Sequence, residues 1–154
     1  MSDTIESRLH ALGLVLPAVT ATRGSFKPYV ILGNTLHLSG KGAPLREAVQ
    51  KIPKVGAEVS VAEAQAHARD IALYLLAVTR QALGDLERIK QVVKVFGMVN
   101  ATPDFTQHTE VINGCSDLLV QVLGARGEHA RSAIGVASLP KGFAVEIEAV
   151  VAFT

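Results

Sequence analysis

The chain has 154 residues, of which 49% are hydrophobic and 19% are charged, and its formal net charge is +1. This composition excludes a disordered chain and predicts one domain that is large enough to bury a substantial core. The near-neutral charge gives no electrostatic support for nucleic acid or an anionic membrane as a partner. The apolar share is high for a small monomer and suits a protein that buries surface against copies of itself.

Cysteine, histidine and the N-terminal sequence limit the chemistry further. Cys115 is the single cysteine, so an intramolecular disulfide and a cysteine zinc site are both excluded. The five histidines show no ligand spacing such as His-x-x-x-His, and we expect no metal. "MSDTIESRLHALGLVLP" carries early acidic residues unlike a signal peptide, and no run of about 20 apolar residues could span a bilayer. These features predict a cytoplasmic protein.

The N-terminal part of the chain predicts a short helix and then a β-hairpin. Asp3, with Glu6 three residues later, is typical of a helix N-cap, and Gly13 is expected to end the helix. Residues 29–39 predict two strands with Gly33-Asn34 as the turn between them.

The middle of the chain predicts a loop followed by a long helix. Residues 40–58 are rich in glycine, proline, lysine and glutamate and lack a strong periodicity, so we expect a loop there. Ser60 and Glu63 then form the capping box of a helix that ends at Gly84 and carries apolar residues along one face.

The last part of the chain predicts a strand, a second long helix and a closing hairpin. Residues 88–100 are rich in β-branched side chains, and residues 107–123 repeat apolar residues at helical spacing. Residues 129–153 predict two apolar strands joined by a Leu-Pro-Lys-Gly turn. The order predicts an α/β (α+β) sandwich with a single mixed β-sheet that carries both long helices on one face. Self-association is the simplest cover for the other, partly apolar face.

Three charged residues interrupt the predicted closing hairpin. Arg131 stands at the entrance of its first strand, and Glu146 and Glu148 lie in its second. Charged side chains are rarely buried without a partner, so these residues mark either a solvent-facing surface or a site. Alternation along a strand places the two glutamates on the same face.

The same hairpin resembles a known family. "RSAIGVASLP" (131–140) followed by "VEIEAVV" (145–151) resembles the C-terminal signature of the YjgF/RidA family, the reactive-intermediate imine deaminases. The resemblance covers most of residues 26–153, with residues 1–25 as an added N-terminal helix and lead-in to a single domain of residues 1–154. This addition resembles a branch labelled endoribonuclease or chorismate-mutase-like. Further matches are "PYV" (28–30), "LSG" (38–40), "ALGDLERI" (82–89) and "VIN" (111–113).

The resemblance implies an architecture, a reaction and a set of site residues. It implies a chorismate-mutase-like (bacillus type) homotrimeric barrel with a cleft between neighbouring subunits. The implied reaction is the hydrolysis of 2-imino or enamine acids to 2-keto acids and ammonia, without a cofactor. Arg131 is implied to hold the substrate carboxylate with its planar fork, and Glu146 to position or activate water. Tyr29, Asn113 and Ala133 are implied to contact the substrate, Ala133 through its backbone.

Each implied role has an ordinary structural alternative. Tyr29 could serve in packing, and Asn113 could cap or cross-link helices. Glu148 could exchange roles with Glu146, one acting in the site and the other in a salt bridge. Ser132 could add a hydroxyl to the site, and Cys115 is expected to be a buried small hydrophobe.

Two residues depart from the family pattern and leave the substrate open. His129 precedes Arg131 where the family tends to have a small residue or proline, and this change could reshape the mouth of the cleft. Lys41 follows "LSG" where many members have glutamine, and it could add positive charge near an anionic ligand.

Two other functions remain alternatives to the deaminase. The same cleft could bind a small carboxylate such as a keto acid without turnover. A ribonuclease would need paired acid and base groups and a basic track for phosphates. Arg88, Lys90 and Lys94 form only a sparse track, so this function ranks last.

Overall fold

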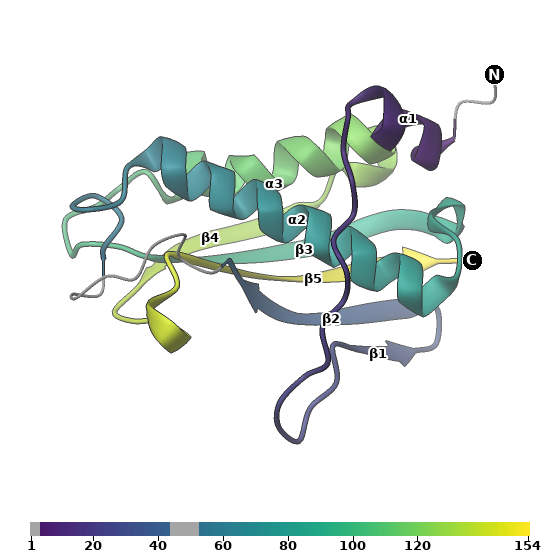
Figure 1. Ribbon diagram of the computed structural model, residues 1–154, viewed down its shortest axis with the longest axis horizontal. Helices are drawn as coiled ribbons and strands as arrows, with labels where there is room; N and C mark the ends of the chain where they lie inside the picture. Colours follow the sequence, from purple (N-terminus) through teal and green to yellow (C-terminus); the bar gives the residue numbers. More distant parts are fainter. Residues whose placement is uncertain (1–3, 44–52) are drawn as a thin grey trace.

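The computed structural model describes residues 4–43 and 53–154, which form two layers, with helices α2 and α3 side by side on one face of a β-sheet (Figure 1). The elements follow the order predicted from the sequence. The helices are α1 (Ile5–Ala11), α2 (Val61–Leu83) and α3 (His108–Leu123). The strands are β1 (Tyr29–Leu32), β2 (Thr35–Gly42), β3 (Ile89–Asn100), β4 (Ala130–Val136) and β5 (Val145–Phe153). Short 3₁₀ turns are η1 (Leu86–Arg88), η2 (Gly124–Gly127) and η3 (Pro140–Gly142).

The sheet is mixed, as predicted, and its strand order is β1-β2-β5-β3-β4. β3 and β4 are parallel neighbours, joined through α3, whereas the other neighbouring pairs are antiparallel. The predicted closing hairpin is therefore wrong, because β3 lies between β4 and β5. An apolar alternating pattern indicates a strand but does not select its partner, and the intervening residues 137–144 are long enough to cross β3.

Hydrogen bonds hold this crossing segment against the end of β3. Lys54 donates to the side-chain oxygen of Asn100 and to the backbone oxygen of Ala137. The Asn100 amide then donates 3.1 Å to the backbone oxygen of Phe143. Asn100 is fully buried, so its polar atoms need these partners.

The N-terminal helix begins one residue later than the sequence predicted. Thr4 is its N-cap, and the Thr4 and Ser7 side chains satisfy each other's backbone N–H groups at 3.1 and 3.0 Å. The predicted cap, Asp3, lies outside the described residues, and Glu6 takes no part in the capping box. A threonine side chain can accept the same hydrogen bond as aspartate, so the residue types alone left both caps possible.

The other predicted boundaries are close to the observed ones. Gly33 adopts a φ of 56° in the β1–β2 turn, and the Ser60–Glu63 capping box begins α2. Gly84 follows α2 with a φ of 81°. In the predicted loop, β2 continues to Gly42 and Val55 bridges to Val59 and Ala101, whereas residues 44–52 lie outside the described part.

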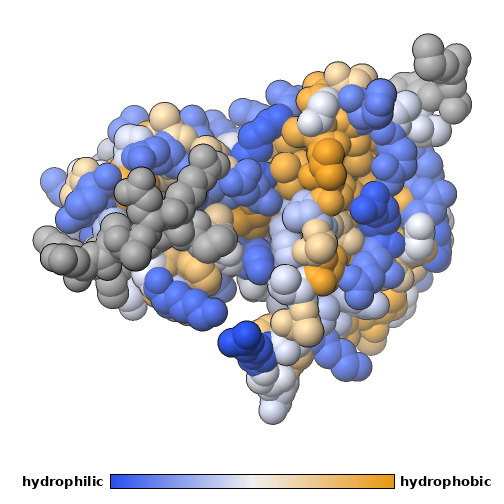
Figure 2. All heavy atoms as spheres, in the orientation of Figure 1, coloured by the Kyte–Doolittle hydropathy of each residue, from blue (hydrophilic) through white to orange (hydrophobic). Residues whose placement is uncertain are grey.

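The segment between α1 and β1 (residues 12–28) is the lead-in to the sheet. It crosses α2 and descends past the edge of the sheet (Figure 1). Leu14, Leu16 and Val19 pack against the core, and Figure 2 shows apolar residues gathered over this crossing. Val15 is 83% exposed in the single chain. The lead-in is thus attached to the helical layer by apolar contacts.

The sheet has one covered and one uncovered face. Val145, Ile147 and Ala149 alternate along β5 toward the helices and are buried. The opposite face exposes apolar side chains, among them Leu32, which is 72% exposed, and Ile134, which is 43% exposed. In residues 4–43 and 53–154, no helix combines the length and hydrophobicity that a bilayer crossing requires.

Gly114 lets the backbones of the two long helices lie close together, and its replacement tests their packing. A Cβ atom at Gly114 would lie 2.1 Å from the backbone oxygen of Gln65. Alanine favours a helix over glycine by about 1 kcal/mol. We nevertheless expect Gly114→Ala to lower the free energy of unfolding in urea by about 2 kcal/mol, because the backbones must separate.

Asp117→Ala, at an exposed position on the same helix, is the matched control and should change stability by less than about 0.5 kcal/mol. A Gly114→Ala protein that is as stable as the parent would contradict the close approach.

Candidate functional site

Arg131 lies on the edge strand β4 and points toward the helical layer. It pairs in register with the buried Val95 of β3, so its side chain leaves the same face of the sheet. Its Nη1 donates 2.9 Å to the side-chain oxygen of Asn113 and 3.0 Å to the hydroxyl of Ser116, both on α3. Within the described residues, no carboxylate pairs with this half-buried guanidinium. Its orientation is fixed while its charge is available to an anion.

A second hydrogen-bond chain supports the Arg131 contact. His129 Nδ1 lies 2.6 Å from the backbone oxygen of Gly127, and Nε2 lies 2.9 Å from the Ser116 hydroxyl. A carbonyl only accepts, so Nδ1 carries the hydrogen, and in the neutral ring Nε2 accepts from Ser116. The Ser116 oxygen can then accept from Arg131. Ser116 was missed from the sequence, although it lies one helical turn after Asn113 and therefore on the same face.

Cys115 lies between Asn113 and Ser116 in the sequence but is buried in the hydrophobic core, as expected. Burial raises the pKa of its thiol to about 12, while the nearby Arg131 charge acts in the opposite direction. The thiol is therefore protonated at neutral pH and is a packing residue rather than a nucleophile.

Glu146 lies on the face of β5 that turns away from the helices. The carboxylate is accommodated by Gly40, where the β2–β5 pairing shifts register. A Cβ atom at Gly40 would lie 2.5 Å from Oε1 of Glu146. Burial, and to a lesser extent the charge of Glu148, raises the pKa of Glu146. A raised pKa makes a carboxyl a stronger base than an ordinary carboxylate, which suits it to taking up and returning a proton.

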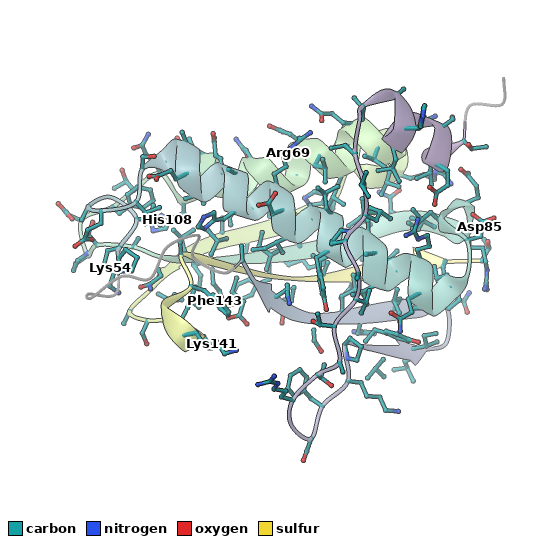
Figure 3. All side chains as sticks on the ribbon, in the orientation of Figure 1. Lys54, Arg69, Asp85, His108, Lys141 and Phe143 are labelled. Atoms are coloured by element: carbon teal, nitrogen blue, oxygen red, sulfur yellow. The ribbon has the colours of Figure 1, made fainter. Side chains whose placement is uncertain are left out.

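A cavity of about 1000 Å³ opens beside Glu146. Its walls come from the lead-in to β1, from β2 and α2, and from the crossing segment between β4 and β5. Figure 3 shows Lys141 and Phe143 on that crossing segment. Its lining includes Arg23, Phe26, Lys41, Lys141, Phe143 and Glu146.

The structure brings together only some of the predicted site residues. Asn113 contacts Arg131, and Ala133 follows on the same face of β4, partly buried against the core. Glu146 lies beyond β3 and on the opposite face of the sheet. Tyr29 packs against the core from β1, at the other edge of the sheet. One chain therefore presents two half-sites, which are Arg131 with Asn113 and Glu146 with its cavity.

The remaining candidates have simple surroundings. Ser132 faces away from Arg131, and its hydroxyl lies 3.4 Å from the Lys94 ammonium. Glu148 shares the face of Glu146 and is exposed. The Lys41 ammonium lies 4.1 Å from the centre of the Tyr74 ring. In the described part of the chain, no group of three histidine, cysteine or acidic side chains could hold a metal ion.

Comparisons with known proteins confirm the resemblance found in the sequence. The model of a family described as "YjgF/chorismate mutase-like, putative endoribonuclease" matches residues 6–145. The chain is 42% identical to Protein TCP17 of Trypanosoma cruzi over 97% of this chain and 94% of that protein. A crystal structure of a "putative endoribonuclease" from Shewanella oneidensis MR-1 has 33% identity and a TM-score of 0.90, covering 98% and 100%. RidA from an Antarctic Psychrobacter has 27% identity and a TM-score of 0.58, covering 86% and 92%.

The raised pKa of Glu146 gives a test of the environment around this carboxyl. Glu148→Gln removes a nearby negative charge, so the pKa of Glu146 should fall. The pKa should remain above its ordinary value, because burial is the larger cause. Carbon-13 NMR of labelled glutamate side chains during a pH titration measures this change. Glu128→Gln is the exposed control, and an unchanged or higher Glu146 pKa in Glu148→Gln would contradict the assignment.

Proposed function

This chain belongs to the "YjgF/chorismate mutase-like, putative endoribonuclease" family, and on that premise we propose that it hydrolyses 2-imino or enamine acids to 2-keto acids and ammonia. The observation that carries this proposal is that one chain holds both an oriented guanidinium and a carboxyl with a raised pKa. Arg131 is oriented and has no carboxylate partner among the described residues, and the pKa of Glu146 is raised. The likeness to the Psychrobacter protein described as RidA supports the same reaction class.

The proposed site forms between subunits of a homotrimer. Arg131 and Glu146 leave opposite faces of one sheet, so a common substrate requires Arg131 of one subunit and Glu146 of another. The exposed apolar side chains on the uncovered face, Leu32 and Ile134 among them, favour such an assembly. Tyr29, at the far edge from Arg131, would then contact the substrate beside a neighbouring Arg131.

The chemistry needs charge recognition and proton transfer. The Arg131 guanidinium holds the carboxylate next to the imine carbon through charge-assisted hydrogen bonds. Water adds to that carbon and gives a carbinolamine. In forming it, Glu146 takes a proton from the attacking water and passes it to the nitrogen. A second transfer through Glu146 moves the hydroxyl proton of the carbinolamine to the nitrogen, so that the C–N bond breaks, ammonia leaves and the carbonyl forms. The imine carbon is already electrophilic, so we expect no cofactor.

A small-carboxylate-binding protein is the second candidate. The same Arg131 anchor would hold a keto acid without turnover, and the two functions differ only in whether Glu146 transfers a proton. Endoribonuclease activity has less support in these residues. Arg88, one member of the sparse basic track, already donates to the backbone oxygens of Thr154 at 2.8 Å and Leu83 at 3.0 Å.

Ammonia release from 2-imino acids generated in situ tests the proposed reaction. Glu146→Gln should lower kcat by about 10²- to 10⁴-fold, because the amide cannot transfer the proton, while keto acid binding persists. Arg131→Ala should mainly raise KM. Arg131→Lys should not restore the parent KM, because an ammonium lacks the planar, two-pronged fork of a guanidinium.

The control variant is Lys90→Ala, an exposed position on β3, which should behave as the parent. Keto acid binding without turnover in the parent would favour the binding protein. RNA cleavage that survives Arg131→Ala would favour the ribonuclease.

A further inference from the structure

The cavity beside Glu146 carries an excess of positive charge. Arg23 from the lead-in, Lys41 from β2 and Lys141 from η3 line it, and Glu146 is the single carboxylate among its described lining residues. None of the three cations forms an ion pair with a described residue. Unpaired like charges repel one another across a shared cavity, and an anion between them would relieve this repulsion.

The backbone at Lys141 is the first sign that this charge is specifically placed. Lys141 has φ 55° and ψ 15°, the left-handed region that residues with a side chain rarely adopt, and it is the one non-glycine with positive φ in the described part of the chain. A glycine would adopt this conformation without steric cost. Figure 3 shows Lys141 at the tip of its turn, on the side of the molecule where the loop of the lead-in (residues 20–26, the lead-in loop) lies. Strained residues of this kind gather at ligand sites.

Tyr74 of α2 contacts both of the other segments that carry a cation, β2 and the lead-in. Its ring lies under the Lys41 ammonium at 4.1 Å, a cation–π contact that does not neutralise the positive charge. Its hydroxyl lies 3.3 Å from both the backbone nitrogen and the hydroxyl of Thr20, at the start of the lead-in loop. Within that loop the Thr22 hydroxyl donates 2.8 Å to the backbone oxygen of Phe26, on either side of Arg23. The loop that carries Arg23 is therefore held at the cavity wall.

We infer that this cavity is a subsite for a second anionic group, so that the preferred ligands are 2-imino or 2-keto acids with a carboxylate at the end of the side chain. The inference rests on the proposed function for the position of the first carboxylate, which Arg131 of a neighbouring subunit would hold. Arg23, Lys41 and Lys141 would hold the second. The reacting carbon would then lie between the two anions, beside Glu146.

Calorimetric titration of the assembled protein with two keto acids of equal carbon number tests the subsite. 2-Oxoglutarate carries a terminal carboxylate, whereas 2-oxopentanoate carries a methyl group in its place. We expect about tenfold tighter binding of 2-oxoglutarate, with a preference that weakens at high salt. Arg23→Met combined with Lys141→Met should abolish the preference and leave the Kd of 2-oxopentanoate within about twofold of the parent.

Lys90→Met removes an exposed charge outside the cavity lining and is the matched control, which should keep the preference. The two single variants, each with a partial loss of preference, extend the test if the double variant does not fold.

Equal affinities in the parent, or a preference that survives both substitutions, would overturn the subsite. Ammonia release without discrimination between the corresponding imines would retain the deaminase and remove the subsite. Preferential 2-oxoglutarate binding without ammonia release would retain the subsite and remove the deaminase.

Discussion

A β-strand sends successive side chains to opposite faces of its sheet, and this alternation governs where the charged groups of this protein can act. Arg131 leaves the helical face of β4, whereas Glu146 leaves the uncovered face of β5, with β3 between them. Within a single chain the two groups therefore point away from each other, on opposite sides of the sheet. The apolar side chains exposed on the uncovered face provide a reason for chains to associate, and association is also what the proposed chemistry requires.

Each half-site is prepared before any ligand arrives. The Arg131 guanidinium is oriented by Asn113 and Ser116, and Ser116 is in turn positioned by His129. This order lowers the rotational freedom that a ligand would otherwise have to remove. At the other half-site, Gly40 leaves room for the carboxyl of Glu146, and partial burial raises its pKa. One half-site is thus suited to charge recognition and the other to proton transfer.

Much of the fold could be predicted from the sequence, because its signals are local. The Ser60–Glu63 box and Gly84 mark the ends of α2, and alternating apolar residues mark the strands. The pairing of β4 with β3 rather than β5 could not be predicted, since alternation does not name a partner. The C-terminal motif led to Arg131 and Glu146, but not to Ser116, whose role depends on the register between α3 and β4. The cavity beside Glu146 also depends on distant segments, because Arg23 and Lys141 meet there only through the tertiary fold.

Mixing two variants, each impaired when substrate is kept below the KM of the parent, tests most directly whether the site is shared between subunits. Arg131→Ala and Glu146→Gln chains would be coexpressed in equal amounts, and all of their assemblies would be purified together and assayed for ammonia release. If each site takes Arg131 from one subunit and Glu146 from the next, about a quarter of the sites in a random equal mixture are intact. We expect such a mixture to recover about a quarter of the parent activity. A mixture no more active than the separate variants would contradict a site shared between subunits.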